Sequence, residues 1–420
     1  MVKRWFASLF HGVWRRNLMR SGMVTGLILA LLVVGLGIAY YEHGRGNLHK
    51  LEAKIVTVHE DAPVPRPGGQ EAIVLTRTQL AGGSLPEFLS VTMLPGRGMN
   101  VLQITAFLPD KGEVNLLASP TVEQAALAMT GRDADAGGAA SLAMGGAFEA
   151  PWAGRMGGVA SQGRVAVGWR GHTMTLPAAG TEASVAMDGM ILSRAADSAD
   201  TAALPDGGQA AATFDAGDFG AHWPSKTDVR VTVLLSSRSI ELTVTAHNTG
   251  DVAEPIGIGW HPRFAIRGNR EQLRLRVPGQ MRAEARGGLP TGVLLPVAGT
   301  AYDFTARDGA RLGKMALDET FVQLRQELLD NGPVAELSDP ASNYGLRLTA
   351  LGSTIKAIHV EAPADADFVS IEPQFNYDDP FGREWDKVTD TGMAVLQPGQ
   401  TTQWKVRLEL LALSGGTSTQ

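Results

Sequence analysis

Hydrophobic and polar residues alternate along much of the chain, which is the pattern of strands whose two faces differ. Residues 229–233 alternate between valine and polar side chains, and residues 240–246 repeat the alternation after the polar turn SSRS at 236–239. This arrangement predicts a β-hairpin. The segments 273–277, 346–348 and 406–410 alternate in the same way. Many short strands separated by glycine and proline predict an all-β sandwich.

Two glycine- and alanine-rich stretches interrupt the alternation, Thr130–Gly146 and Ala196–Lys226. We predict that both form long loops. Long loops on a rigid β scaffold often line a binding site, but surface insertions have the same composition. The sequence leaves both interpretations open.

The N-terminal region contains an uncharged apolar segment, residues 23–41, whose length is typical of a membrane-spanning helix. Residues 1–22 contain five basic residues and no acidic one. The positive-inside rule therefore predicts that residues 1–22 lie in the cytoplasm and that the rest lies outside it. We expect a single-pass anchor in the inner (cytoplasmic) membrane, with the main domain in the periplasm. A cleaved twin-arginine signal is the alternative, because residues 15–20 read RRNLMR.

The segment that follows, residues 42–67, is polar and contains three prolines near its end. This composition predicts a short stalk. The remaining residues, 68–415, are then expected to form one large β domain.

Composition excludes several classes of function. The 37 basic and 43 acidic residues give a net charge of −6, which argues against nucleic acid as a partner. The chain has no cysteine, so disulfides, thiolate nucleophiles and cysteine-ligated metals are excluded. No phosphate-binding loop, dinucleotide fingerprint or HExxH motif is present, so we predict neither a cofactor nor a metal.

Acidic residues near the C-terminus raise the question of calcium binding. The group consists of Asp378, Asp379, Glu384 and Asp386. Carboxylate oxygens could hold Ca²⁺, but a solvated loop has the same composition. We predict the solvated loop.

Four short segments place polar groups in apolar or glycine-rich surroundings. They are GGAFEAPWAGRMGG (145–158) with Trp152 and Arg155, PIGIGWHPRFAI (255–266) with His261, MALDETFVQL (315–324) with Asp318, and VSIEPQFNYDDPFG (369–382) with Glu372. Each residue alone has a structural interpretation, such as a helix cap or a strand end. Together they offer an imidazole and a carboxylate for acid–base chemistry, and groups that bind sugar hydroxyls and stack on a pyranose.

In these segments the chain resembles the aldose 1-epimerase (galactose mutarotase) family. The order PWAGR, GWHPRF, LDETF and IEPQ is similar to the family's signatures. The resemblance implies a large antiparallel β-sandwich of the galactose mutarotase kind over about residues 72–413. It implies that Glu372 is the catalytic base and His261 the catalytic acid. It further implies that Arg155 and Asp318 bind sugar hydroxyls, with no cofactor.

The chain departs from the family pattern at two binding positions. Where the family often has a histidine followed by glycine, this chain has Asp188 in AMDGMIL. An ionised aspartate accepts a hydroxyl hydrogen bond but cannot donate one. The family's substrate-binding glutamine has no clear counterpart, and Gln374 or His359 is the candidate replacement.

Two functions remain open. The first is an aldose 1-epimerase, an isomerase that interconverts the α and β anomers of a free monosaccharide outside the cytoplasm. The second is a non-catalytic carbohydrate-binding domain accessory to an envelope glycan or a sugar-oxidation system. For catalysis we expect His261 and Glu372 about a pyranose-width apart, on opposite sides of the sugar ring. We expect Pro373 to turn the Glu372 carboxylate towards the site and away from solvent.

Overall fold

A computed structural model describes residues 29–43, 63–80, 83–130, 138–180, 183–327 and 329–413. The chain divides into two compact units, residues 1–63 and 64–420. In the first unit, residues 29–43 form a helix with exposed apolar side chains. No helix among the described residues has both the length and the hydropathy of a membrane span, so the predicted transmembrane helix is not supported. Residues 1–28 and 44–62, which include part of that segment and most of the predicted stalk, lie outside the described residues.

The larger sheet of the second unit has eleven strands, and neighbouring strands are antiparallel. Its order is β1 (Ile73–Thr76), β2 (Glu87–Leu94), β3 (Asn100–Leu108), β5 (Gly146–Glu149), β16 (Gly259–Ala265), β25 (Phe368–Gln374), β24 (Ala357–Ala362), β21 (Leu317–Leu324), β18 (Gly279–Arg286) and β19 (Leu289–Pro296), with β4 (Gly112–Asn115) paired to β3. The middle strands therefore come from distant parts of the chain.

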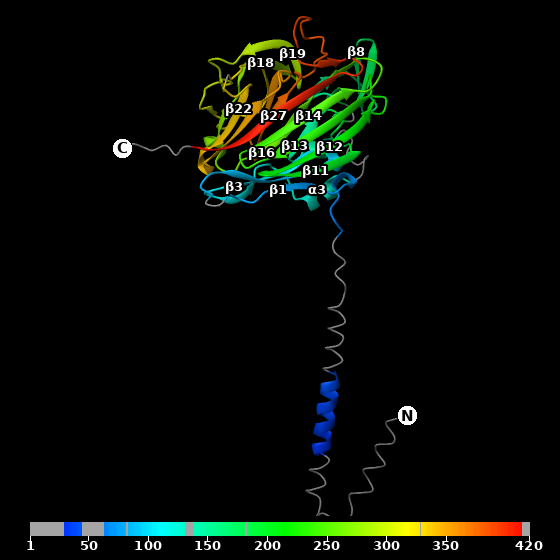
Figure 1. Cartoon of the computed structure of the whole chain (residues 1–420), viewed down its shortest axis with the longest axis vertical. Helices are drawn as coiled ribbons and strands as arrows, with labels where there is room; N and C mark the ends of the chain where they lie inside the picture. Colours follow the sequence, from blue (N-terminus) through cyan, green and yellow to red (C-terminus); the bar gives the residue numbers. More distant parts are fainter. Residues whose placement is uncertain are drawn as a thin grey trace, which may run out of the picture. The chain divides into compact units, whose positions relative to one another are not determined.

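The second large sheet has nine strands, several of which lie side by side in Figure 1. Its order is β11 (Ser198–Leu204), β12 (Gly207–Gly217), β13 (Thr227–Leu235), β14 (Ser239–Asn248), β27 (Thr401–Ala412), β23 (Tyr344–Ala350), β22 (Val334–Asp339), β17 (Arg274–Arg276) and β20 (Ala310–Arg311). The antiparallel pairing of β13 with β14 confirms the predicted hairpin.

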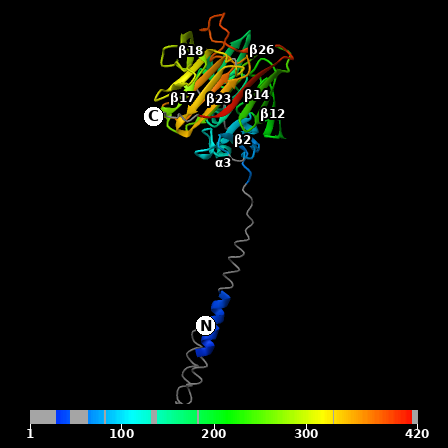
Figure 2. The same cartoon turned by 60° about the vertical axis from the view of Figure 1, so that its left-hand side comes forward.

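Smaller elements surround the two sheets. Three short sheets consist of β6 (Arg155–Gly157) with β10 (Val185–Met187), of β15 (Glu254–Ile256) with β26 (Ala394–Leu396), and of β7 (Val159–Ser161), β8 (Arg164–Trp169) and β9 (His172–Pro177). The helices of this unit are α3 (Val122–Ala128), α4 (Ala139–Leu142) and the 3₁₀ turns η1 (Pro67–Gly69), η2 (Pro95–Arg97), η4 (Arg270–Gln272) and η5 (Pro340–Ser342). Figure 2 shows α3 beside β2, where Ala125 packs with Leu94 and Leu102.

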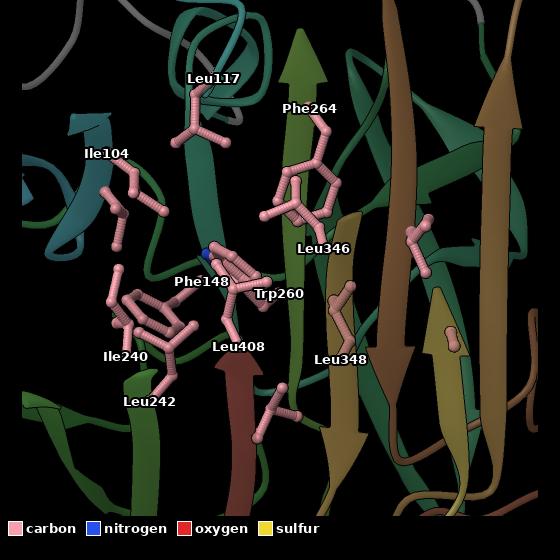
Figure 3. Packing of buried hydrophobic residues seen from close by; sticks show 14 of the residues in the cluster. Ile104, Leu117, Phe148, Ile240, Leu242, Trp260, Phe264, Leu346, Leu348 and Leu408 are labelled. Atoms are coloured by element: carbon pink, nitrogen blue, oxygen red, sulfur yellow. The ribbon is translucent and has the colours of Figure 1, made fainter. Parts of the chain in front are cut away.

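The core fills the space between the two large sheets. Figure 3 shows Phe148 and Trp260 of the eleven-stranded sheet close to Ile240, Leu242 and Leu408 of the nine-stranded sheet. All of these side chains are fully buried. Packing of two apolar sheet faces is the main source of stability in a β-sandwich. The predicted all-β sandwich is confirmed.

The predicted loop at residues 196–226 is wrong, because most of it forms the paired strands β11 and β12. Ala210, Ala212 and Phe214 are buried on one face of β12, and alanine is too weakly hydrophobic to mark this alternation in the sequence. The turn between the strands uses Gly207, at φ 145°. In the other predicted loop, residues 139–142 form α4 and residues 131–137 lie outside the described residues.

Candidate active site

Of the predicted site residues, His261, Glu372 and Asp318 lie on one face of the eleven-stranded sheet. Along β25, Val369 and Ile371 enter the core, so Ser370, Glu372 and Gln374 take the opposite face. The register places polar side chains of β5, β16, β24 and β21 on that face as well. Five adjacent strands thus carry one polar cluster on the face that points away from the core.

His261 and Glu372 are direct neighbours. The flanking Trp260 and Phe264 are buried in the core, which leaves His261 on the polar face of β16. The His261 Nδ1 atom lies 3.3 Å from Oε1 of Glu372. Glu372 is only 2% exposed, so its carboxylate points into the cluster, as expected of the residue before Pro373. The expected separation of a pyranose width is wrong, because the two strands are adjacent in the sheet.

The environment sets opposite charges on this pair. Burial disfavours the carboxylate of Glu372, but the positive charges of His261 and His359 outweigh it and lower its pKa to about 2. Burial also disfavours the charged imidazole of His261, yet Glu372, Glu149 and Asp188 raise its pKa well above the usual value. At neutral pH the cluster therefore contains an ionised carboxylate beside a protonated imidazole.

A second histidine lies next to this pair. His359 of β24 is directly opposite Glu372 in the sheet register. Its Nδ1 lies 2.9 Å from the Thr320 hydroxyl, which donates to Asp378 at 2.6 Å. Since that hydroxyl proton points to Asp378, the His359 Nδ1 must donate to Thr320. The Nε2 atom is 3.2 Å from Oδ1 of Asp318.

Arg155 completes the rim of the cluster. Its Nη2 donates to both carboxylate oxygens of Asp318, at 2.8 and 2.9 Å. Hydrogen bonds from His359 and Arg155 hold the pKa of Asp318 below its usual range. Burial opposes charging of His359, but Glu372, Asp318 and Asp378 raise its pKa to about 9. Asp318 remains half exposed, so this pair is the accessible edge of the site.

Asp188 follows β10 and is buried in the same cluster. Burial and the nearby carboxylate of Glu149 raise the pKa of Asp188 well above its usual value. The raised pKa favours the protonated form of Asp188, which can donate a hydrogen bond as well as accept one.

The structure adds residues that sequence reasoning missed. Glu149 of β5 is fully buried, with Oε1 3.7 Å from His261 Nδ1, and Glu361 of β24 has Oε2 3.7 Å from His261 Nε2. A signal was available, since Glu149 is a carboxylate in an apolar strand close to a proline, as Glu372 is. The alternation of β24 similarly places His359 and Glu361 on the same face.

Two predicted sugar contacts are not placed on the accessible face. Trp152 is fully buried and stacks on Trp223, with ring centroids 5.7 Å apart. Its indole belongs to a second hydrophobic cluster, so it offers no face to a sugar. Gln374 is also fully buried, and its amide donates to the carbonyl oxygen of Asn376. The role of Gln374 is to hold the chain after β25.

The prediction of a solvated acidic loop is wrong for half of that group. Asp378 and Asp379 are buried and accept backbone hydrogen bonds from Arg155 and Gly157, respectively. These contacts fasten β6 to the segment that follows β25. Glu384 and Asp386 are exposed.

Two sets of side chains have the spacing of cation ligands. One is Glu149, Asp188 and His261, and the other is His261, Glu361 and Glu372, with the ligand atoms of each set within 4.8 Å of one another. Both sets contain His261. A cavity among the described residues of this unit is lined by Met190, Ser193, Arg194, Ala195, Asp197 and Phe219, and thus by none of these residues.

Comparison with known proteins agrees with this architecture. The profile of the aldose 1-epimerase family matches residues 141–409. Among curated protein sequences, no relative is detected. A galactose mutarotase-like protein from Clostridium acetobutylicum has a similar structure, with a TM-score of 0.64, 16% identity, and coverage of 77% of this chain and 93% of that one.

Two further structures share the fold. An aldose epimerase homologue from C. elegans has a TM-score of 0.59 at 15% identity, with 81% of this chain and 99% of that chain covered. A galactose 1-epimerase from Lactobacillus acidophilus has a TM-score of 0.56 at 18% identity, with the same coverage of both chains. The family profile covers more than half of the 420 residues. The chain belongs to the aldose 1-epimerase family.

Proposed function

We propose that the protein is an aldose 1-epimerase that interconverts the anomers of a free aldose by acid–base ring opening. The observation that carries the proposal is the pairing of the His261 imidazole with the Glu372 carboxylate at 3.3 Å. Both reacting oxygens of a hemiacetal, the anomeric hydroxyl and the ring oxygen, are bonded to the same carbon. Two groups that lie this close together can therefore serve both oxygens.

In the ring-opening step, Glu372 removes the proton of the anomeric hydroxyl and His261 donates a proton to the ring oxygen. The bond from C1 to the ring oxygen breaks, and its electron pair stays on that oxygen while the C1 carbonyl forms. Rotation about C1–C2 followed by the reverse transfers gives the other anomer. Each positioned acid or base contributes an acceleration of about 10²–10⁴.

The charges of the resting site support these roles. An ionised Glu372 can act as a base, and a protonated His261 can act as an acid. The sugar approaches from the accessible side of the pair. Its anomeric hydroxyl donates to Glu372, and its ring oxygen accepts from the His261 imidazole.

Sugar binding is assigned to the accessible rim. Arg155 donates and Asp318 accepts, which suits neighbouring hydroxyls of a pyranose. His359 holds Asp318 in place, with its Nε2 atom 3.2 Å from Oδ1 of Asp318. Asp188 stands where the family often has a histidine, and its raised pKa favours the protonated form, which can donate to the sugar.

Polarimetry tests the proposal. The full-length chain is added to freshly dissolved α-D-glucose or α-D-galactose, and the approach of the optical rotation to equilibrium is followed. We expect acceleration by the native protein and none by Glu372→Gln, which keeps the size of the side chain but removes its basicity. Decay at the buffer rate for a panel of aldoses, together with measurable sugar binding, would instead identify the non-catalytic carbohydrate-binding domain.

The location of the domain stays a prediction from the sequence of residues 1–41. Protease treatment of intact spheroplasts tests whether the β domain lies outside the cytoplasm. Digestion of the β domain from outside agrees with the prediction, and protection until lysis contradicts it.

A further inference from the structure

Glu149 is a buried carboxyl group of the cluster that ring opening does not use, and burial raises its pKa against the lowering effect of His261. It is fully buried, and neither carboxylate oxygen has a hydrogen-bond donor among the described residues. Its Oε1 lies 3.7 Å from Nδ1 of His261, slightly beyond hydrogen-bond distance. A buried carboxylate without partners is costly, so its place beside an imidazole calls for a function.

On β16, which pairs with β5, a glycine leaves space for the Glu149 carboxylate. Gly259 of β16 pairs directly with Glu149. A Cβ atom at Gly259 would lie 2.2 Å from Oε2 of Glu149 and 2.7 Å from the Cβ of Ala153. Any larger residue at this position would therefore displace the carboxylate from His261.

The two nitrogens of His261 have different surroundings. Nδ1 lies near the buried carboxylates of Glu372 and Glu149, at 3.3 and 3.7 Å. Nε2 lies 3.7 Å from Glu361, whose side chain is 28% exposed. The nitrogen on the accessible side is therefore Nε2, and Nδ1 faces the interior.

We propose that Glu149 is a positioning residue, which holds the Nδ1 proton of His261 so that the Nε2 proton faces the ring oxygen of the sugar. This inference rests on the proposed function. During ring opening Glu372 takes up a proton and ceases to be a charged partner for His261. Glu149 then remains as the acceptor next to Nδ1 that orients the imidazole.

Asp188 is the second buried carboxyl group beside His261. One ligand atom each of Glu149, Asp188 and His261 lies within 4.8 Å of the other two. Burial and the neighbouring Glu149 raise the pKa of Asp188 well above its usual range, and burial also raises the pKa of Glu149. The groups that face His261 are thus Glu372 on β25, Glu149 on β5, Asp188 after β10 and Glu361 on β24.

The test measures the titration of His261 directly. The full-length chain is labelled with ¹³C-histidine, and the His261 signal is assigned by its loss in His261→Asn. In Glu149→Gln we expect the midpoint of the His261 titration to fall by about one pH unit or more, because an adjacent opposite charge is removed. Glu254→Gln is the matched control, since Glu254 is another buried carboxylate and belongs to no part of the site. It should leave the His261 midpoint unchanged.

Kinetics and a second variant separate positioning from mere structural support. Glu149→Gln should lower kcat about tenfold or more with little change in KM, since the sugar does not touch this residue. Gly259→Ala keeps the charge but displaces the carboxylate, and it should shift the His261 titration in the same direction. If Gly259→Ala does not fold, Glu149→Gln alone decides.

Several outcomes would overturn the inference. An unchanged His261 midpoint in Glu149→Gln, or a rise in KM alone, excludes the positioning role. A stoichiometric divalent cation in the purified native protein that Glu149→Gln loses would make Glu149 a metal ligand instead. If the titration shifts as expected but neither protein accelerates mutarotation, the orienting contact holds and the proposed function fails.

Discussion

The indole Nε1 of Trp404 donates a hydrogen bond of 2.9 Å to the carbonyl oxygen of Pro373. Trp404 belongs to β27 of the nine-stranded sheet and Pro373 to β25 of the eleven-stranded sheet. The bond therefore crosses the core and fixes the backbone at the residue after Glu372. Because Pro373 has no backbone donor and a restricted φ, its carbonyl oxygen is a rigid point of attachment.

Replacing Trp404 should lower the stability of the fold and also allow the Glu372 side chain more motion. Trp404→Phe leaves a buried carbonyl oxygen unpaired and a small cavity, and we expect a loss of about 2–4 kcal/mol in the free energy of unfolding. Urea denaturation measures this loss, and kcat should fall as Glu372 gains freedom. Trp152→Phe is the control, since the buried Trp152 Nε1 makes no hydrogen bond with the described residues. Equal losses for the two variants would show that the cross-sheet bond contributes nothing.

The rate of mutarotation should vary little with pH near neutrality. The base must be ionised, so activity is lost as the pH falls through the pKa of Glu372, about 2. The acid must be protonated, so activity is lost as the pH rises through the raised pKa of His261. We expect kcat/KM, corrected for the buffer reaction, to stay within about twofold from roughly pH 5 to 7.5. A step near the ordinary pKa of histidine would contradict these charge states.

Asp318→Asn should weaken sugar binding more than it slows the chemistry. The variant loses a charged acceptor that Arg155 and His359 hold in place, so we expect KM to rise about 10- to 100-fold. Initial rates over a range of sugar concentrations measure this change. Glu319→Gln is the matched control, because Glu319 pairs with Arg282 and lies on the other face of β21. A rise in KM of equal size in the control would remove Asp318 from the binding surface.

The buried Glu254 should make the fold less stable at neutral pH than in mild acid. Burial raises its pKa to about 7, against the opposing hydrogen bond from Thr227. The folded state thus binds the proton more tightly, and stability falls as the pH rises from about 4.5 through about 7. The native protein should lose about 3 kcal/mol more over this range than Glu254→Gln does.

Unfolding free energies at pH 5 and pH 8 measure this difference. The exposed Glu113→Gln serves as the control and should follow the native protein. Parallel pH profiles for the native protein and Glu254→Gln would show that Glu254 is not responsible.

The parts of the fold that the sequence predicts are local ones. The hairpin at residues 229–246 has its turn and both alternating strands within one short segment, so periodicity suffices. The pairing of β5 with β16, by contrast, joins residues more than 100 positions apart. Nothing in the spacing of residues along the chain predicts this strand pairing. The pairing nevertheless places Glu149 beside His261.

In the candidate site, too, some residues are predictable from the sequence and others only from the fold. Glu372 and His261 are predictable because their segments resemble those of a known family, whereas this resemblance assigns no role to Glu149 in residues 145–158. The prediction for Trp152 is wrong for a different reason: its position near Arg155 in the sequence suggests a surface on which a sugar could stack. In the folded protein, Trp223 stacks on the Trp152 ring and helps to bury it, and this contact is not visible in the sequence.

The order of strands in the nine-stranded sheet also affects how the protein is made. β27 (Thr401–Ala412) is the last described strand, yet it lies between β14 and β23. During synthesis on the ribosome, the edges of β14 and β23 that face β27 therefore remain unpaired until β27 has emerged and paired with them. The attachment of Pro373 to Trp404 forms at the same late stage, so the backbone next to Glu372 is fixed only after translation has passed this segment.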